Sequence, residues 1–566
     1  MLTSPGMITR RWLAAHGGAL LCSIALYGAA PDTPVADAAR AGDRAAVQRL
    51  LRDGADVNTA HGDGMTALHW AATNGDAELT NMLLHGGGKV VSRTRLGGYT
   101  PLALAAEAGH GAVVAALIKA FADANAADTS GTSVLMLAAA SGDRDTIRVL
   151  IEHGADIHAR ESAMEQTALM FAAAYNRVNA IEILLAHGAQ LDAASKVVNV
   201  TAPAARGPAP PGAPAGGGPP RGRGTPTGVA GRERPYSYSE LVGTQGGLTP
   251  LLFAVRQGYA DSVKALVAAG ADVNTVSAGD KTSPLLMAII NGHFDLAQYL
   301  VDRGADVTRA SNAGVTPLYA VLNIQWGPKS MYPQPQAYLQ QKVSYLDLMK
   351  ALVAKGADVN ARVNRKVWFT SFNTDLSGVD EIGATPFWRA AYASDVDAMR
   401  LLVASGADPN IPTMRPAGRP RPADSDREAG ADVSGLPPIP VGGPGVPPLL
   451  AAAGVGYGEG FAANSHRYAP TGFLPAIEYL VDELGADVNA VDYDGNTAVH
   501  HAASRGDTES ILYLVSKGAD VRRLNREGQS TADMANAPTQ RVQPFPETLA
   551  TLVKLGAKNN HKCVSC

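Results

Sequence analysis

Along most of the chain, apolar residues recur in short stripes that each end at a glycine. Val47, Leu50 and Leu51 precede Gly54 by seven, four and three residues, and the same spacing precedes most later glycines of this kind. Apolar positions at i, i+3 and i+4 predict one buried face of a short α-helix. A glycine after such a helix suits the left-handed position at its C-terminus.

These stripes belong to a sequence repeat of about 33 residues. The tripeptide Gly-Ala-Asp marks the period, and its copies begin at Gly54, Gly154, Gly270, Gly304, Gly356, Gly406, Gly485 and Gly518. Neighbouring copies are separated by 34 residues (Gly270 to Gly304) or 33 residues (Gly485 to Gly518). Self-similarity at a fixed period of this length predicts a solenoid of stacked units.

Each unit also carries a motif that begins with threonine. Thr66-Ala-Leu-His-Trp-Ala-Ala72 and Thr100-Pro-Leu-Ala-Leu-Ala-Ala106 are examples. Threonine caps helix N-termini and proline is tolerated in the first turn, so the motif predicts the start of a helix. The two signatures resemble the ankyrin repeat, whose pattern is Thr-Pro-Leu-His-x-Ala-Ala followed by Gly-Ala-Asp-Val-Asn.

This resemblance covers nearly everything from Val35 to Lys558. It implies an all-α solenoid of about twelve helix-turn-helix units with hairpin loops, in two blocks at 35–194 and 248–559. In such repeats the histidine of the motif, here His69, is expected to bond locally and to tie adjacent units. We expect the same of His500 rather than a catalytic role.

Several insertions interrupt the period. The Pro/Gly-rich stretch 195–247 has almost no large apolar side chains and is expected to be disordered. It falls in a hairpin loop between units, as do 363–383 and 411–446, whereas 325–345 and 454–473 fall between the two helices of a unit. The intact period on both sides favours loops of one solenoid, while a break into two blocks near the first insertion stays open.

The N-terminus has the form of an export signal. Arg10 and Arg11 precede a mostly apolar run that ends in small residues at Ala30. Residues 1–30 are therefore expected to be removed, and the arginine pair resembles a twin-arginine signal. A retained anchor is the alternative, and no other stretch is long and apolar enough to cross a bilayer. The mature protein is expected in the periplasm or outside the cell.

Charge and motif content narrow the function classes. The chain has 48 Lys and Arg against 52 Asp and Glu, which disfavours bulk binding to nucleic acid or an anionic membrane. Three cysteines exclude a disulfide scaffold.

The run that starts at Asp492 resembles the beginning of an EF-hand calcium loop. It has Ala503 at the twelfth position, where that loop needs glutamate, so no metal site is expected. A hydrolase within 411–473, with His466 as its test residue, is a third hypothesis that has no nucleophile–base pair.

The tail, residues 560–566, holds the last two cysteines as Cys563-Val-Ser-Cys566. This spacing matches the c-type haem motif Cys-x-x-Cys-His except for its histidine, and export suits haem attachment. Covalent haem on Cys563 and Cys566 requires a histidine after Cys566. A terminal dithiol or disulfide, or a metal site, is the other interpretation.

The ankyrin resemblance implies a non-catalytic scaffold, expected to be a monomer, that binds a protein partner on its concave surface. The residues carried over occupy motif positions that are expected to be exposed, just before the motif threonine or just after the paired alanines. They are Met65, Thr73, Asn74, Tyr99, Glu107, Arg256, Gln257, Tyr392, Tyr493, Asn496, Ser504 and Arg505. The alternative function is electron transfer, with the solenoid docking a partner onto a C-terminal haem.

Overall fold

The computed structural model describes residues 33–201, 241–327, 337–367, 379–417, 432–457, 467–537 and 542–562. The chain divides into two compact units. Unit 1 takes in Met1–Val197 and Gly246–Ser277, and unit 2 takes in Val198–Gln245 and Ala278–Cys566.

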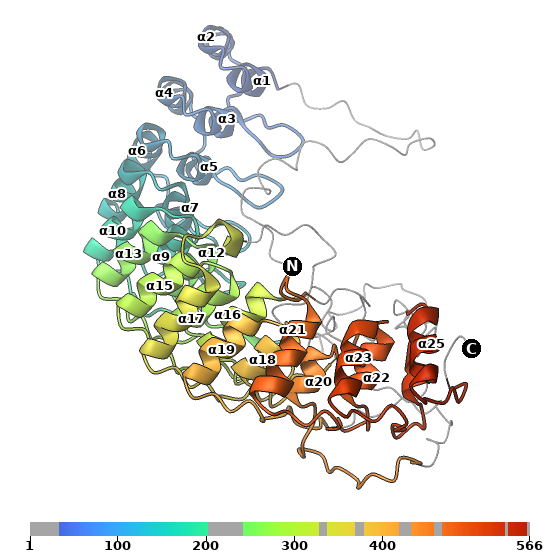
Figure 1. Ribbon diagram of the computed structural model, residues 1–566. Coiled ribbons are helices and arrows are strands. Elements are labelled where there is room, and N and C mark those ends of the chain that lie inside the picture. Colours follow the sequence, from blue (N-terminus) through green and yellow to red (C-terminus); the bar gives the residue numbers. More distant parts are fainter. Residues whose placement is uncertain are drawn as a thin grey trace, which may run out of the picture. The chain divides into compact units, whose positions relative to one another are not determined.

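Unit 1 is a stack of helix pairs. In chain order they are α1 (Pro34–Arg40) with α2 (Arg44–Arg52), α3 (Ala67–Thr73) with α4 (Ala77–His85), α5 (Pro101–Ala108) with α6 (Gly111–Lys119), α7 (Val134–Ser141) with α8 (Arg144–Glu152), α9 (Ala168–Ala174) with α10 (Val178–Ala186), and α12 (Pro250–Gln257) with α13 (Ala260–Ala268). First helices pack on first helices and second helices on second, so α5 lies between α3 and α7 (Figure 1). Helix α6 lies in the same way between α4 and α8.

Unit 2 repeats the arrangement with longer connections. Its pairs are α14 (Pro284–Ile290) with α15 (Phe294–Asp302), α16 (Pro317–Gln325) with α17 (Tyr345–Ala354), α18 (Pro386–Tyr392) with α19 (Val396–Ala404), α20 (Pro448–Ala452) with α21 (Phe473–Glu478), α22 (Ala498–Ser504) with α23 (Thr508–Ser516), and α24 (Thr531–Ala535) with α25 (Pro546–Lys554). A π-helix, η3 (Tyr479–Glu483), continues α21, and a 3-10 helix, η2 (Ala337–Gln340), precedes α17. The short strands β1 (Val197–Asn199) and β2 (Thr244–Gly246) form a two-stranded sheet.

The expected all-α repeat solenoid is confirmed: the described residues form twelve helix pairs. The threonine motif begins the first helix of a repeat, as the sequence predicts. The Thr100 hydroxyl accepts the backbone N–H of Ala103, and Pro101 occupies the first turn. Gly109 ends this helix at φ 73°, where a side chain would be strained. The paired alanines 105 and 106 are fully buried, which brings neighbouring helices close.

An asparagine at the end of Gly-Ala-Asp-Val-Asn links successive repeats. The Asn58 amide donates to the carbonyl of Gly87 at 3.1 Å and accepts the N–H of Lys89 at 2.8 Å. The same bridge joins Asn125 to Gly154, Asn360 to Gly406, and Asn489 to Gly518. A side chain with both a donor and an acceptor is needed to pair with the two backbone groups, which only an amide provides here.

Several sequence predictions fall outside the described residues: the export signal at 1–30, most of the insertion at 195–247, His466, Cys563 and Cys566. Among the residues that the structure does describe, no helix is both long and apolar enough for a membrane span.

Candidate interaction surfaces

The motif histidines are part of the scaffold. In α3, Nδ1 of His69 lies 2.9 Å from the Thr66 hydroxyl, and Nε2 lies 3.1 Å from the carbonyl oxygen of Tyr99 in the next repeat. Burial lowers the pKa of His69. His500 contacts Thr497 in the same way at 2.9 Å. The expectation that His69 ties two repeats is therefore met by its geometry.

A line of large apolar side chains follows the first helices of unit 1. They occupy the fifth position of the threonine motif in five successive repeats: Trp70, Leu104, Leu137, Phe171 and Phe253. We call these five residues the apolar row. Helices α3, α5, α7, α9 and α12 pack on one another in that order (Figure 1). Because the five residues occupy the same motif position on these helices, they follow one another from repeat to repeat.

An arginine lies over the aromatic ring at each end of the apolar row. The guanidinium carbon of Arg40 is 5.1 Å from the centre of the Trp70 ring, and that of Arg256 is 5.1 Å from the centre of the Phe253 ring. Phe253 is 5% exposed, whereas the other four members of the row are partly exposed. A half-buried apolar line with a cation at both ends is suited to binding an apolar segment of a partner.

The residues that sequence analysis carried over in unit 1 flank this row. Thr73, Glu107 and Arg256 each follow a row residue by three positions, which places them on the same helix face. Thr73, Asn74 and Glu107 are exposed, and the remaining four are half-buried: Met65, Tyr99, Arg256 and Gln257. The row itself was not among the predicted residues, although a large apolar residue recurs at the fifth motif position in five repeats.

In unit 2 the expectation of exposed side chains is wrong for Tyr392, Asn496, Ser504 and Arg505. Tyr392 is 5% exposed and stacks on the Trp388 ring at 5.2 Å. Asn496 and Ser504 are 9% and 4% exposed. Tyr493 is half-buried.

The Arg505 side chain is only 5% exposed because residues at the two ends of the insertion between α20 and α21 contact it. Its guanidinium carbon lies 3.6 Å from the centre of the Phe473 ring, and it donates to the carbonyl of Ala453. It also forms an ion pair with Asp507. Arg505 occupies a position that is expected to be exposed in a repeat without insertions, but here it binds the two ends of the insertion between α20 and α21.

A buried polar cluster, which sequence analysis also missed, lies between α16, α17, α18 and α19. The Arg389 guanidinium donates through Nε to the Asn323 side chain and through Nη2 to the carbonyl of Trp326, each at 2.8 Å. Burial lowers the pKa of Arg389, which is 2% exposed. Tyr345 and Trp326 both donate to Asp395, at 2.9 and 2.8 Å. These bonds join two successive repeats and hold the start of the insertion after α16.

The turn at Asp492 is a repeat turn. One carboxylate oxygen of Asp492 accepts the N–H groups of Asp494 and Asn496, at 3.0 and 2.9 Å, and the other lies 2.9 Å from Nε2 of His501. Across the described residues, no group of three or more His, Cys, Asp or Glu side chains is arranged to hold a metal ion. This carboxylate is occupied by its own backbone and by a buried histidine.

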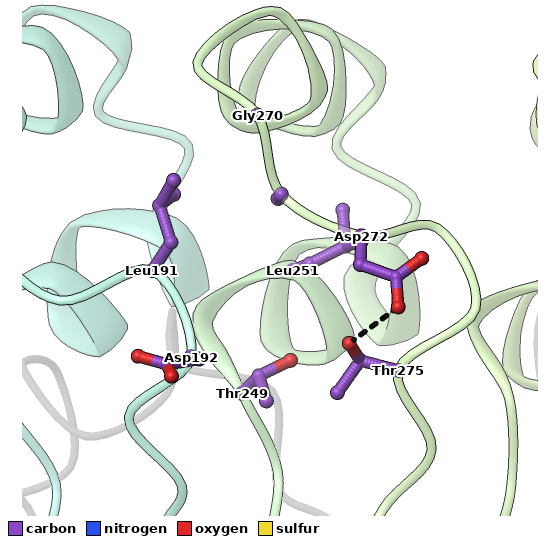
Figure 2. Close-up of a pocket in the computed structure, with 8 residues that line it drawn as sticks. Leu191, Asp192, Thr249, Leu251, Gly270, Asp272 and Thr275 are labelled. Atoms are coloured by element: carbon purple, nitrogen blue, oxygen red, sulfur yellow. Dashed lines mark hydrogen bonds between the residues drawn. The ribbon is translucent and has the colours of Figure 1, made fainter.

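A pocket of about 260 Å³ opens in unit 1 between the loops of two successive repeats. It is lined by Leu191, Asp192, Thr249, Leu251, Gly270, Ala271, Asp272 and Thr275. Figure 2 shows Asp192 and Asp272 on opposite sides, with Asp272 bonded to Thr275 at 3.3 Å. Asp192 stands where other repeats have the bridging asparagine, and a carboxylate cannot donate to the Gly270 carbonyl. The pocket thus lies at a joint between repeats that lacks the asparagine bridge.

Comparison with known proteins gives consistent results along the chain. The family described as ankyrin repeats (3 copies) matches residues 12–94, 35–128, 90–161, 113–195 and 237–311. A second ankyrin-repeat family matches 466–515, and the single ankyrin repeat matches 382–414.

Three curated relatives illustrate the range of similar proteins. Transient receptor potential cation channel subfamily A member 1 of Drosophila melanogaster is 30% identical over 25% of this chain and 12% of its own length. Human ankyrin repeat and SOCS box protein 6 is 36% identical over 19% of this chain and 28% of its own. Mouse protein phosphatase 1 regulatory subunit 12A is 37% identical over 12% of this chain and 7% of its own length.

The matched stretches thus span less than a third of the length of each of these relatives. The family models match residues in both units and coincide with the helix pairs described above. The chain therefore belongs to the ankyrin-repeat family.

Proposed function

We propose that this protein is a non-catalytic scaffold that binds a protein partner, and that the partner docks on the apolar row of unit 1. The observation that carries the proposal is the row itself: five large apolar side chains on adjacent helices, four of them partly exposed. Large side chains held by a rigid scaffold lose little entropy on binding, which favours affinity. Relatives that include a regulatory subunit support a binding role.

The flanking side chains suit the same role. Glu107 and Arg256 lie one helical turn from Leu104 and Phe253, so polar groups border the apolar line. Interfaces with an apolar centre and a polar border are typical of specific complexes. We further propose, from the N-terminal signal alone, that the partner is met outside the cytoplasm.

The test is a quantitative binding measurement with a partner isolated on the full-length protein. Phe171→Glu and Leu104→Glu place a charge in the row and are each expected to weaken binding at least about tenfold. Leu512→Glu is the matched control, because Leu512 is 48% exposed on α23, outside the row. Equal affinity of the row variants and the control would exclude the row as the docking surface, while circular dichroism verifies that each variant is folded.

A further inference from the structure

One aromatic side chain of unit 1 stands in an unfavourable place. Phe121 occupies the position that is glycine in the other repeats of this unit, at φ 62°. This left-handed conformation disfavours residues with a side chain. Phe121 is also 93% exposed, and Val91 on the preceding loop is 71% exposed. Covering the exposed ring in a complex would remove its apolar surface from water, which favours binding through Phe121.

The pocket between Asp192 and Gly270 is large enough for this ring. Its volume is about 260 Å³, and Leu191, Leu251 and Ala271 form the apolar part of its lining, beside the polar side chains of Asp192, Thr249, Asp272 and Thr275. A cavity of roughly 150 Å³ accepts benzene, so this volume is sufficient for a phenyl ring.

The charges around the two features are complementary. Lys119 is exposed at the end of α6, two residues before Phe121. Asp192 and Asp272 border the pocket, and both residues are exposed. A lysine beside the ring would therefore meet a carboxylate beside the pocket, which favours the correct orientation.

We propose that two copies of this chain pair through unit 1, with Phe121 of each copy inserted into the pocket of the other. Phe121 and Gly270 occupy the same position of their repeats, after the second helix, so ring and pocket lie along one edge of the stack of second helices. A twofold axis across that edge brings both rings over both pockets at once and closes the assembly. This pairing differs from the monomer that the sequence predicts, and it does not depend on the proposed partner site on the apolar row.

The test compares Phe121→Gly with the unmodified full-length protein by sedimentation velocity over a range of concentrations. The unmodified chain is expected to pass from one to two copies as concentration rises. Phe121→Gly is expected to raise the dissociation constant at least about thirtyfold. The same variant is expected to unfold at a higher denaturant concentration, because glycine accepts φ 62° without strain. Loss of pairing with gain of stability cannot arise from misfolding.

A second experiment exchanges the charges of Lys119 and Asp192. Lys119→Glu and Asp192→Lys are each expected to weaken pairing about tenfold, and the double variant is expected to recover most of it. Leu96→Ala is the control, since Leu96 is 68% exposed in unit 1 but lies away from the ring and the pocket in its repeat.

Three results would overturn the proposal. They are a single copy at every concentration, pairing that Phe121→Gly leaves unchanged, and a mass that grows beyond two copies. The last result would mean that each contact uses one ring and that the twofold pairing is wrong.

Discussion

The indole N–H of Trp326 donates to the carboxylate of Asp395 at 2.8 Å, across 69 residues of sequence. Asp395 is 2% exposed and caps α19 by accepting the N–H of Ala398 at 3.0 Å. The Tyr345 hydroxyl donates to the same carboxylate oxygen as Trp326. One buried side chain thus caps its own helix and holds both ends of the insertion between α16 and α17.

Replacing this carboxylate is expected to be costly. Asp395→Ala removes the helix cap, worth about 1 kcal/mol, and leaves the buried Trp326 N–H and the half-buried Tyr345 hydroxyl without an acceptor, at about 1–2 kcal/mol each. We expect the free energy of unfolding to fall by about 3–5 kcal/mol in urea titration.

The control uses the same position of another repeat. Asp143 caps α8 by accepting the N–H of Thr146, and no inserted segment bonds to it in the described structure. Asp143→Ala should lower the free energy of unfolding by only about 1 kcal/mol. Similar losses for the two variants would show that Asp395 acts as a cap alone.

The buried histidine of α22 predicts a loss of stability in mild acid. Burial, followed by the charge of His501, lowers the pKa of His500 from 6.5 to about 4. The unfolded chain therefore binds this proton at a higher pH than the folded chain does. Stability is fully present above about pH 6.5 and falls as the pH drops toward 4, by about 2 kcal/mol between about pH 7 and about pH 5.

His500→Gln isolates that contribution. Glutamine has no proton to gain in this range, so the variant should lose less stability than the unmodified protein over the same two pH values. The measurement is urea unfolding at each pH. Equal losses in both proteins would mean that other groups cause the acid sensitivity.

Because asparagine forms a bridge at the corresponding position of other repeats, we expect Asp192→Asn to stabilise the protein. Asp192→Asn provides a donor for the carbonyl of Gly270 and removes a charge opposite Asp272. A hydrogen bond of this kind contributes about 1 kcal/mol, so the thermal midpoint should rise.

The reverse substitution tests the same bond where it already exists. Asn125 donates to the carbonyl of Gly154 at 2.9 Å and accepts the N–H of Asp156 at 2.7 Å. Asn125→Asp keeps the acceptor but loses the donor, and is expected to destabilise by about 1–2 kcal/mol. If both substitutions leave the midpoint unchanged, the bridge does not stabilise the stack.

The cysteine pair Cys563 and Cys566 gives a chemical prediction that stays open. Covalent haem would appear in the intact mass of the protein purified from its source and as a Soret band in its visible spectrum. A mass equal to that of the polypeptide, with no chromophore, would contradict the haem interpretation and leave a dithiol or disulfide.

The repeat pattern was sufficient to predict the family and a stack of about twelve helix pairs. Each repeat contacts only its neighbours, so a threonine before a helix and a glycine after it define the element without long-range information. The local role of His69 followed from the same motif, since its partners lie in its own repeat and the next.

The sequence alone determined which elements form and in what order they stack, because those contacts recur within one period. Only the tertiary structure decided which side chains remain exposed. Arg505 and Tyr392 occupy positions that are open in a plain repeat, but inserted segments and aromatic neighbours bury them. The bond from Trp326 to Asp395 involves an insertion, and the pocket at Asp192 lies at a joint without the asparagine bridge. Both depend on groups that no periodic pattern specifies.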